Sequence, residues 1–250
     1  MYFDAHTHLN DEKEQNLNGE SSIGGSCVNG TSEEDWKHIL HFCATKPGIL
    51  VPSIGLHPWY INQRTAGWFD RLRETLMGDP GIHLGEIGLD KSRKSSSKYE
   101  TQKLVCRRQL ILGKELNRTI SIHCVSAHGT IFEMLREVFP DGSIAPPMLL
   151  HAWSGSLEMT LAFCKYFPHC FFSFSSPKTS KSIMAVPTDR ILCETDDSRS
   201  SHLFHSYNEM IGLEQFSKLD FKGLKQLLED NFRKCFQRGE IPHHEGDVNC

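Results

Sequence analysis

Short apolar segments recur along the chain, separated by polar loops and by stretches in which apolar residues repeat with helical spacing. In Glu33–Thr45, for example, Trp36, Ile39, Leu40 and Cys43 fall on one side of a helix. Strands that alternate with helices indicate a parallel sheet with crossover connections. The apolar segments, which we interpret as eight β-strands, are Tyr2–Ala5, Ser26–Asn29, Ile49–Gly55, Ile82–Glu86, Thr119–His123, Met148–His151, Cys170–Ser175 and Arg190–Glu194.

Eight such units predict a closed (β/α)8 barrel of the TIM type, which usually contains about 250 residues. The chain has 250 residues. An open doubly wound sheet is the alternative that the alternation alone allows. The sequence shows no internal repeat and no linker, so we expect residues 1–238 to form a single barrel domain and residues 239–250 to form a flexible tail.

The composition narrows the class of protein. Hydrophobic residues make up 38% of the chain and charged residues 23%, as in a globular domain. The net charge of −4 disfavours a broad basic face for nucleic acid, although bound divalent cations would add positive charge at a site. Nine cysteines without a CxxC spacing, no signal-peptide pattern and no membrane-length apolar run favour an intracellular location, cytoplasmic or nuclear, without a membrane. No feature indicates an obligate protein partner.

Residue types that bind metal ions stand at the ends of five predicted strands. In a parallel barrel these ends meet at one face, where barrel enzymes carry their chemistry. An ionisable group at the end of an apolar strand is costly to bury unless a partner such as a cation compensates it. The candidate ligands are His6 and His8, which point to the same face of an extended chain, and Glu86, His123, His151 and Asp196.

Four histidines with two carboxylates suit two borderline divalent ions better than one. We expect His6, His8 and Asp196 to bind one ion, and His123 and His151 to bind the other. Glu86 would bridge the two ions, which such sites hold about 3.5–4 Å apart. Zinc, magnesium or manganese would lower the pKa of a shared water to roughly 7, and Asp196 would orient that water and accept its proton. Glu86 and Asp196 are therefore the expected catalytic residues.

The segments that contain these residues resemble the TatD family of metal-dependent deoxyribonucleases, within the amidohydrolase-like barrels. The matching segments are Phe3–His8, Gly55–Pro58, Gly85–Asp90, Ser121–Cys124, Leu150–His151 and Ile191–Asp196. They follow one another in the family's order. The resemblance implies a metal-dependent hydrolase of phosphodiester bonds, most often a DNase, with DNA or a related phosphodiester as substrate and the same six ligands.

The resemblance also implies that His57 contacts substrate, and the alternative is a loop histidine held by Pro58. Trp59 and Tyr60 could stack on a base or pack the loop. The chain departs from the family after Asp196, where Ala-Pro commonly follows, and in a shorter region between Phe174 and Arg190. Because loops at the mouth of the barrel set substrate choice, these departures leave the substrate open.

Three further residues are candidate substrate contacts. Asp90 could contact substrate or orient a ligand histidine, and a turn or capping role is the alternative. Lys91 and Arg93 belong to the basic segment Lys91–Lys98, which could attract phosphate or form ordinary solvated surface.

Two other functions remain open at this point. The same pair of ions could cleave an amide, a lactone or an aminoacyl ester, because ligands alone do not distinguish carbonyl from phosphoryl substrates. A non-catalytic metal-binding protein could share the fold, although the complete ligand set argues against it.

Substitutions of Asp196 and of its neighbour Asp197 test the assignment of Asp196 as the general base. Alternation along a strand turns Asp197 away from the direction that Glu194 and Asp196 share. We expect Asp196→Asn to lower kcat by roughly 10²–10⁴-fold, the range for a positioned acid–base group, and Asp197→Asn to change it little. Steady-state kinetics would measure both, with circular dichroism as the check on folding. An inactive Asp197→Asn protein beside an active Asp196→Asn protein would overturn the assignment.

Overall fold

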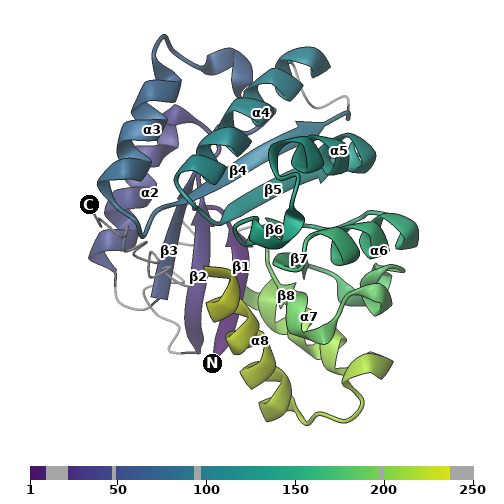
Figure 1. Cartoon of the computed structure of the whole chain (residues 1–250). Coiled ribbons are helices and arrows are strands. Elements are labelled where there is room, and N and C mark those ends of the chain that lie inside the picture. The colour runs from purple at the N-terminus through teal and green to yellow at the C-terminus, as the bar shows by residue number, and fades with distance from the viewer. Residues whose placement is uncertain (10–21, 47–48, 93–96, 197–199, 237–250) are drawn as a thin grey trace, which may run out of the picture.

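A computed structural model of the chain describes residues 1–9, 22–46, 49–92, 97–196 and 200–236. Eight parallel strands form a single sheet and stand in sequence order, which confirms the predicted (β/α)8 barrel (Figure 1). The expected tail, residues 239–250, lies outside the described residues. The strands are β1 (Tyr2–Thr7), β2 (Ile23–Asn29), β3 (Ile49–Ile54), β4 (His83–Asp90), β5 (Ile120–Val125), β6 (Met148–Leu150), β7 (Cys170–Phe174) and β8 (Ile191–Cys193).

The seam between the last strand and the first is joined just beyond β8. The backbone N–H of Asp196 donates to the carbonyl oxygen of His6 at 3.0 Å. The Asp4 carboxylate is buried and accepts from the Thr195 N–H at 3.0 Å and from the Thr195 hydroxyl at 2.8 Å. These bonds hold the segment that carries Asp196 against the strand that carries His6.

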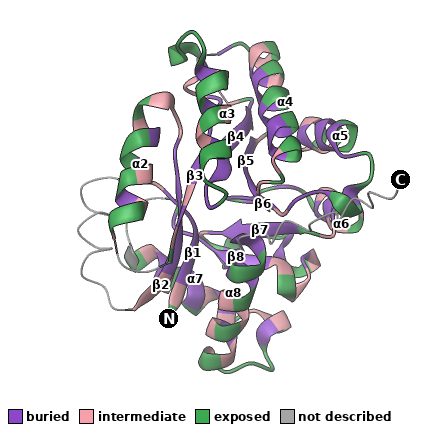
Figure 2. Cartoon of the chain, turned by 60° about the vertical axis from the view of Figure 1, so that its left-hand side comes forward, coloured by how far each residue is buried: buried purple, intermediate pink, exposed green. Residues whose placement is uncertain are grey.

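Helices cover the outside of the barrel with their buried faces turned toward it (Figure 2). In α2 the predicted apolar side is confirmed, since Trp36 and Ile39 are buried. Between β7 and β8 the described chain makes only short 3₁₀ turns, among them Pro177–Thr179 and Ile183–Ala185. No helix in the described ranges is both long enough and apolar enough to span a bilayer. The α-helices are α2 (Glu33–Thr45), α3 (Trp68–Gly78), α4 (Tyr99–Glu115), α5 (His128–Val138), α6 (Leu157–Tyr166), α7 (Ser200–Ile211) and α8 (Phe221–Phe236).

Strand β4 differs from the sequence-based prediction, which ended it at Glu86. The strand continues to Asp90, and Glu86 lies in its middle. Leu84 pairs with Ile120 but Ile87 pairs with Ile122, so β4 has one residue more than β5 over this interval. Such a bulge re-aims the side chain at the extra residue.

Gly88 lets β4 run close to β5. A Cβ atom at this position would lie 1.9 Å from the carbonyl oxygen of His123, and its φ is +147°. Only glycine accepts both the conformation and the contact. The glycines that interrupt the apolar pattern in Gly85–Asp90 are therefore part of the strand, although they conceal it in the sequence.

Two buried glutamines of α4 hold the backbone near the mouth of the barrel. Gln102 accepts from the backbone N–H of Asp90 at 2.9 Å. Gln109 accepts from the backbone N–H of Leu56 at 2.8 Å and donates to the carbonyl oxygen of the same residue at 3.1 Å. Leu56 directly precedes His57, so α4 positions that loop through a side chain with no exposed surface.

We expect Gln109→Ala to destabilise the protein by about 1–3 kcal/mol, because it leaves a buried N–H and a buried C=O of Leu56 without their partner. Chemical denaturation would measure the change. Gln226→Ala, at an exposed position of α8, is the matched control and should leave the midpoint nearly unchanged. Equal midpoints for the two variants would show that Gln109 does not hold the loop.

Candidate metal centre

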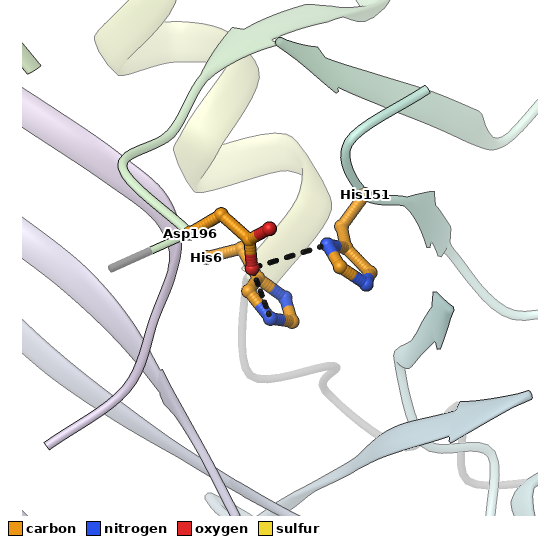
Figure 3. Close-up of side chains that lie close together, drawn as sticks. All are labelled: His6, His151 and Asp196. Atoms are coloured by element: carbon orange, nitrogen blue, oxygen red, sulfur yellow. Dashed lines mark ion pairs between the residues drawn. The ribbon is translucent and has the colours of Figure 1, made fainter. Parts of the chain in front are cut away.

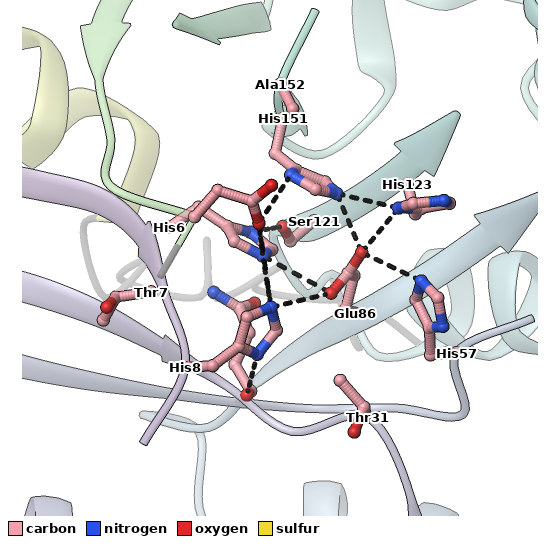
Figure 4. A network of polar contacts seen from close by, with 12 residues as sticks. His6, Thr7, His8, Thr31, His57, Glu86, Ser121, His123, His151 and Ala152 are labelled. Carbon is pink, nitrogen blue, oxygen red and sulfur yellow. Dashed lines mark hydrogen bonds and ion pairs between the residues drawn. The ribbon is translucent and has the colours of Figure 1, made fainter. Parts of the chain in front are cut away.

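The four expected ligand histidines lie around the carboxylate of Glu86 (Figure 4), and Asp196 lies close to three of them. His6 and His8 each place Nε2 near Glu86 Oε2, at 3.4 and 3.3 Å. His123 Nδ1 and His151 Nε2 lie 2.9 and 2.8 Å from Glu86 Oε1. The structure therefore brings the six residues together, although Glu86 comes from the middle of β4 and not from its end, and their role as metal ligands stays a prediction.

Asp196 lies beside the imidazoles of His6 and His151 (Figure 3). Its Oδ1 lies 3.8 Å from Nε2 of both His6 and His8 and 3.7 Å from Nδ1 of His151. The buried Nδ1 of His151 has no hydrogen-bond partner within the described chain. Asp196 thus stands among three imidazoles, whereas the sequence-based assignment paired it with two.

Hydrogen bonds behind the imidazoles orient their ring nitrogens. His8 Nδ1 lies 3.0 Å from the carbonyl oxygen of Asn29, and His123 Nε2 lies 3.2 Å from Asp90 Oδ2. Because these oxygens can only accept, the facing nitrogens carry the protons. His8 Nε2 and His123 Nδ1 are then the nitrogens that can present a lone pair to a cation beside Glu86. Such outer partners are typical of histidines that bind metal.

The electrostatics of the cluster favour positive charge. Burial opposes protonation of His8 and His123, yet the surrounding carboxylates outweigh it and raise the pKa of each imidazole to about 9. Burial also opposes ionisation of Glu86, but the adjacent histidines hold the pKa of its carboxyl well below the usual value. Burial and the nearby His151 lower the pKa of His6 to about 3. A divalent cation would supply positive charge here in place of protons.

His57 is bound into the cluster from the side, where its Nε2 lies 3.2 Å from Glu86 Oε1. The backbone N–H of Trp59 donates to Nδ1 of His57 at 3.1 Å, so Nδ1 carries a lone pair. Burial lowers the pKa of His57 and favours its neutral form. The remaining proton is then on Nε2 and points at Glu86. This geometry fits a hydrogen-bond donor to Glu86 rather than a metal ligand.

The other candidate substrate contacts have different environments. Asp90 is buried, and its Oδ2 faces His123 and also accepts from the Trp59 indole N–H at 2.6 Å. The arrangement favours the alternative in which Asp90 orients a ligand histidine. The Lys91 ammonium lies 4.7 Å from the ring centroid of Tyr99, and Arg93 lies outside the described residues.

Sequence reasoning missed several residues that support the site. Ser121 Oγ contacts His6 Nδ1 at 3.0 Å. Glu194 is fully buried and accepts from the backbone N–H of Ala152 at 2.8 Å and from the Ser173 hydroxyl. Burial raises the pKa of Glu194 to about 8. The alternation of side chains along a strand could have predicted them, because residues i and i+2 point to the same face. Ser121 and Glu194 each stand two residues before an expected ligand.

A cavity of about 430 Å³ opens beside the cluster. The side chains of His8, Glu86 and Asp196 reach it, and Trp59 and Tyr60 contribute aromatic surface. Its size falls within the usual range of about 300–1,000 Å³ for small-ligand sites. The cluster is therefore accessible to a substrate.

The fold and the cluster together define a barrel hydrolase with a histidine–carboxylate site. A family model described as TatD related DNase matches residues 3–237. The chain belongs to this family, which confirms the resemblance seen in the sequence.

Named relatives agree with this assignment. The chain is 25% identical to the uncharacterized metal-dependent hydrolase YabD of Bacillus subtilis, over 95% of this chain and 99% of that protein. It is 25% identical to the 3'-5' ssDNA/RNA exonuclease TatD of Pantoea vagans, over 71% of this chain and 69% of that protein. The crystal structure of YjjV, a TatD homologue from Escherichia coli, shares the fold with a TM-score of 0.79 and 20% identity, over 94% of this chain and 97% of that one.

The contact between Asp90 and His123 predicts an effect on metal affinity. Asp90→Asn replaces the accepting oxygen beside His123 Nε2 by an amide and weakens its hold on the ring. We expect a 10–100-fold loss of Zn²⁺ or Mn²⁺ affinity, roughly the cost of removing such an outer partner, measured by isothermal titration calorimetry. Asp70→Asn, at an exposed position of α3, is the control. Unchanged affinity in the Asp90 variant would favour a role in substrate binding instead.

Proposed function

We propose that the protein is a divalent-metal-dependent nuclease that hydrolyses phosphodiester bonds of single-stranded DNA or RNA. The observation that carries the proposal is the placement of Glu86 among imidazoles whose ring nitrogens are oriented from behind. Such an arrangement fits ligands of a cation better than it fits structural histidines. The 3'-5' ssDNA/RNA exonuclease named among its relatives supports the substrate class.

The residues proposed to hold two cations are His6, His8, Glu86, His123, His151 and Asp196. The fit rests on the donor set and on the Nδ1 of His151, which has no hydrogen-bond partner within the described chain. It also rests on two groups of donor atoms, one from His6, His151 and Asp196 and one from His6, His8 and Glu86, in each of which the atoms lie within 4.8 Å of one another. Bound cations supply Lewis-acid stabilisation of charge on a phosphoryl group and make water a stronger acid. Zinc, magnesium and manganese are the candidates, because a mixed histidine and carboxylate site accepts each of them.

The two carboxylates divide the work according to their environments. The Glu86 side chain is only 3% exposed and is surrounded by imidazoles, so it remains an ionised ligand. The Asp196 side chain is 40% exposed and reaches the cavity, where it can exchange protons with water. We assign Asp196 as the general base that accepts a proton from the attacking water. His57 donates to Glu86 and keeps its carboxylate oriented.

The cavity beside the cluster would receive a nucleotide. Trp59 lines this cavity and its indole N–H is bound to Asp90, so the ring is held in one orientation. A fixed aromatic face suits stacking with a base and favours an unpaired strand, in which bases are free to stack. The proposal thereby assigns to Trp59 the stacking role that the sequence allowed.

Metal removal tests the proposal directly. We expect dialysis against a chelator to abolish cleavage of labelled single-stranded DNA and RNA, and Mg²⁺, Mn²⁺ or Zn²⁺ to restore it, because the proposed base acts beside the cations. Glu86→Gln should not recover on adding metal, whereas Glu74→Gln, at an exposed position of α3, should. Full activity in metal-free protein would contradict the mechanism. Cleavage of esters or amides without any cleavage of nucleic acid would favour the rival hydrolase.

A further inference from the structure

A second cavity, of about 640 Å³, opens at the same end of the barrel, between α6 and the segment that follows β7. It begins at Ala152, the residue after the candidate ligand His151, and it includes Phe174, the last residue of β7. In Figure 1 this region lies beside β6 and β7. The cavity is linked to the metal centre along the chain, because Ala152 directly follows His151.

The chemistry of this cavity differs from that of the first. Seven of its thirteen lining residues carry hydroxyl groups, its one charged lining residue in the described chain is Lys181, and none is acidic. The cavity at the metal centre contains the carboxylates of Asp35, Glu86 and Asp196. Hydroxyl groups beside a cation suit an anion, whereas in the cavity at the metal centre carboxylates and imidazoles stand together.

Two further features of this cavity also suit an anion. Ser182 is 4% exposed, and its hydroxyl lies 3.4 Å from that of Ser180. One hydroxyl of the pair donates to the other, so the pair retains a hydrogen that can point to an oxygen in the cavity. Leu157, the first residue of α6, also lines the cavity, and the positive end of the helix dipole opens there.

The wall of the cavity is aromatic. Trp153 and Phe174 are 4% and 2% exposed, and the Trp153 indole N–H is occupied by the Thr160 hydroxyl at 2.8 Å. These rings are packed into the core and close the apolar floor of the cavity, so the hydroxyl groups and Lys181 at its rim are the groups available to an anionic backbone. The volume of this cavity, about 640 Å³, exceeds the volume of about 430 Å³ of the cavity at the metal centre.

We propose that this second cavity binds the phosphodiester backbone of the nucleotides next to the cleaved bond, with Lys181 as the cationic contact. The proposal rests on the nuclease function proposed above and extends it. The substrate strand crosses the mouth of the barrel, with one nucleotide beside Trp59 and the adjoining ones between α6 and the Ser180–Ser182 segment. The enzyme then prefers longer strands to dinucleotides.

The test compares kcat/KM for an octanucleotide and a dinucleotide of the same base. Lys181→Glu reverses the cavity's charge at an exposed position. Ser156→Asp adds a negative charge there while retaining a side chain that caps α6, as Ser156 does through Met159 N–H. We expect each variant to lower the octanucleotide-to-dinucleotide ratio roughly tenfold, as for loss of one charged hydrogen bond. Lys165→Glu, exposed in the last turn of α6, should keep the ratio of the unaltered protein.

The outcomes separate the two proposals. If the unaltered protein cleaves no nucleic acid with any of the three metals, the nuclease function fails and the second cavity loses its role with it. If it cleaves both lengths but the two cavity variants keep its ratio, only the cavity assignment is wrong. An equal loss on both lengths also overturns the assignment, because it indicates general damage. Thermal denaturation of each variant would confirm that it is folded.

Discussion

The Glu86 carboxylate is buried inside the barrel, so its negative charge has to be balanced by the groups that surround it. A buried carboxylate loses its hydration and has to be compensated by donors or cations. Five imidazoles have a ring nitrogen within 2.8–3.4 Å of its oxygens. They belong to His6 in β1, His8 just after β1, His57 in the loop after β3, His123 in β5 and His151 just after β6. Removing the negative charge would leave several nitrogens facing one another. The cluster is therefore a single electrostatic unit, in which each histidine depends on Glu86.

The backbone conformation just after β6 and β8 helps to place the side chains of this cluster. Asp196 has φ of +53°, and Ala152, which follows His151, has φ of +44°. Left-handed backbone at residues other than glycine costs roughly 1–2 kcal/mol, and such positions gather at functional sites. At Asp196 the turn is held by the bond to the His6 carbonyl. Packing elsewhere in the barrel offsets this strain and keeps the side chain at the mouth.

How much of the site was predictable depends on which interactions define it. The meeting of the six candidate ligands follows largely from topology, because the carboxyl ends of parallel strands converge whatever the details of packing, although Glu86 comes from the middle of β4. The role of His57 was not predictable, because it depends on a backbone N–H from Trp59 that fixes a ring nitrogen. The length of β4 was hidden for a related reason. Its bulge and its glycines break the period of two that identifies a strand.

If the protein is a nuclease, the two cavities at the mouth would interact differently with a polyanionic strand, because their lining residues differ in charge. A polyanionic strand would meet the carboxylates of Glu86 and Asp196 in the cavity at the metal centre, where bound cations would add positive charge. The hydroxyl-rich cavity would present no such carboxylates, since none of its described lining residues is acidic. Hydroxyls and a single lysine bind phosphate without demanding a base sequence. Under the proposed function, chemistry would depend on metal binding, whereas attachment of the strand to the hydroxyl-rich cavity would not.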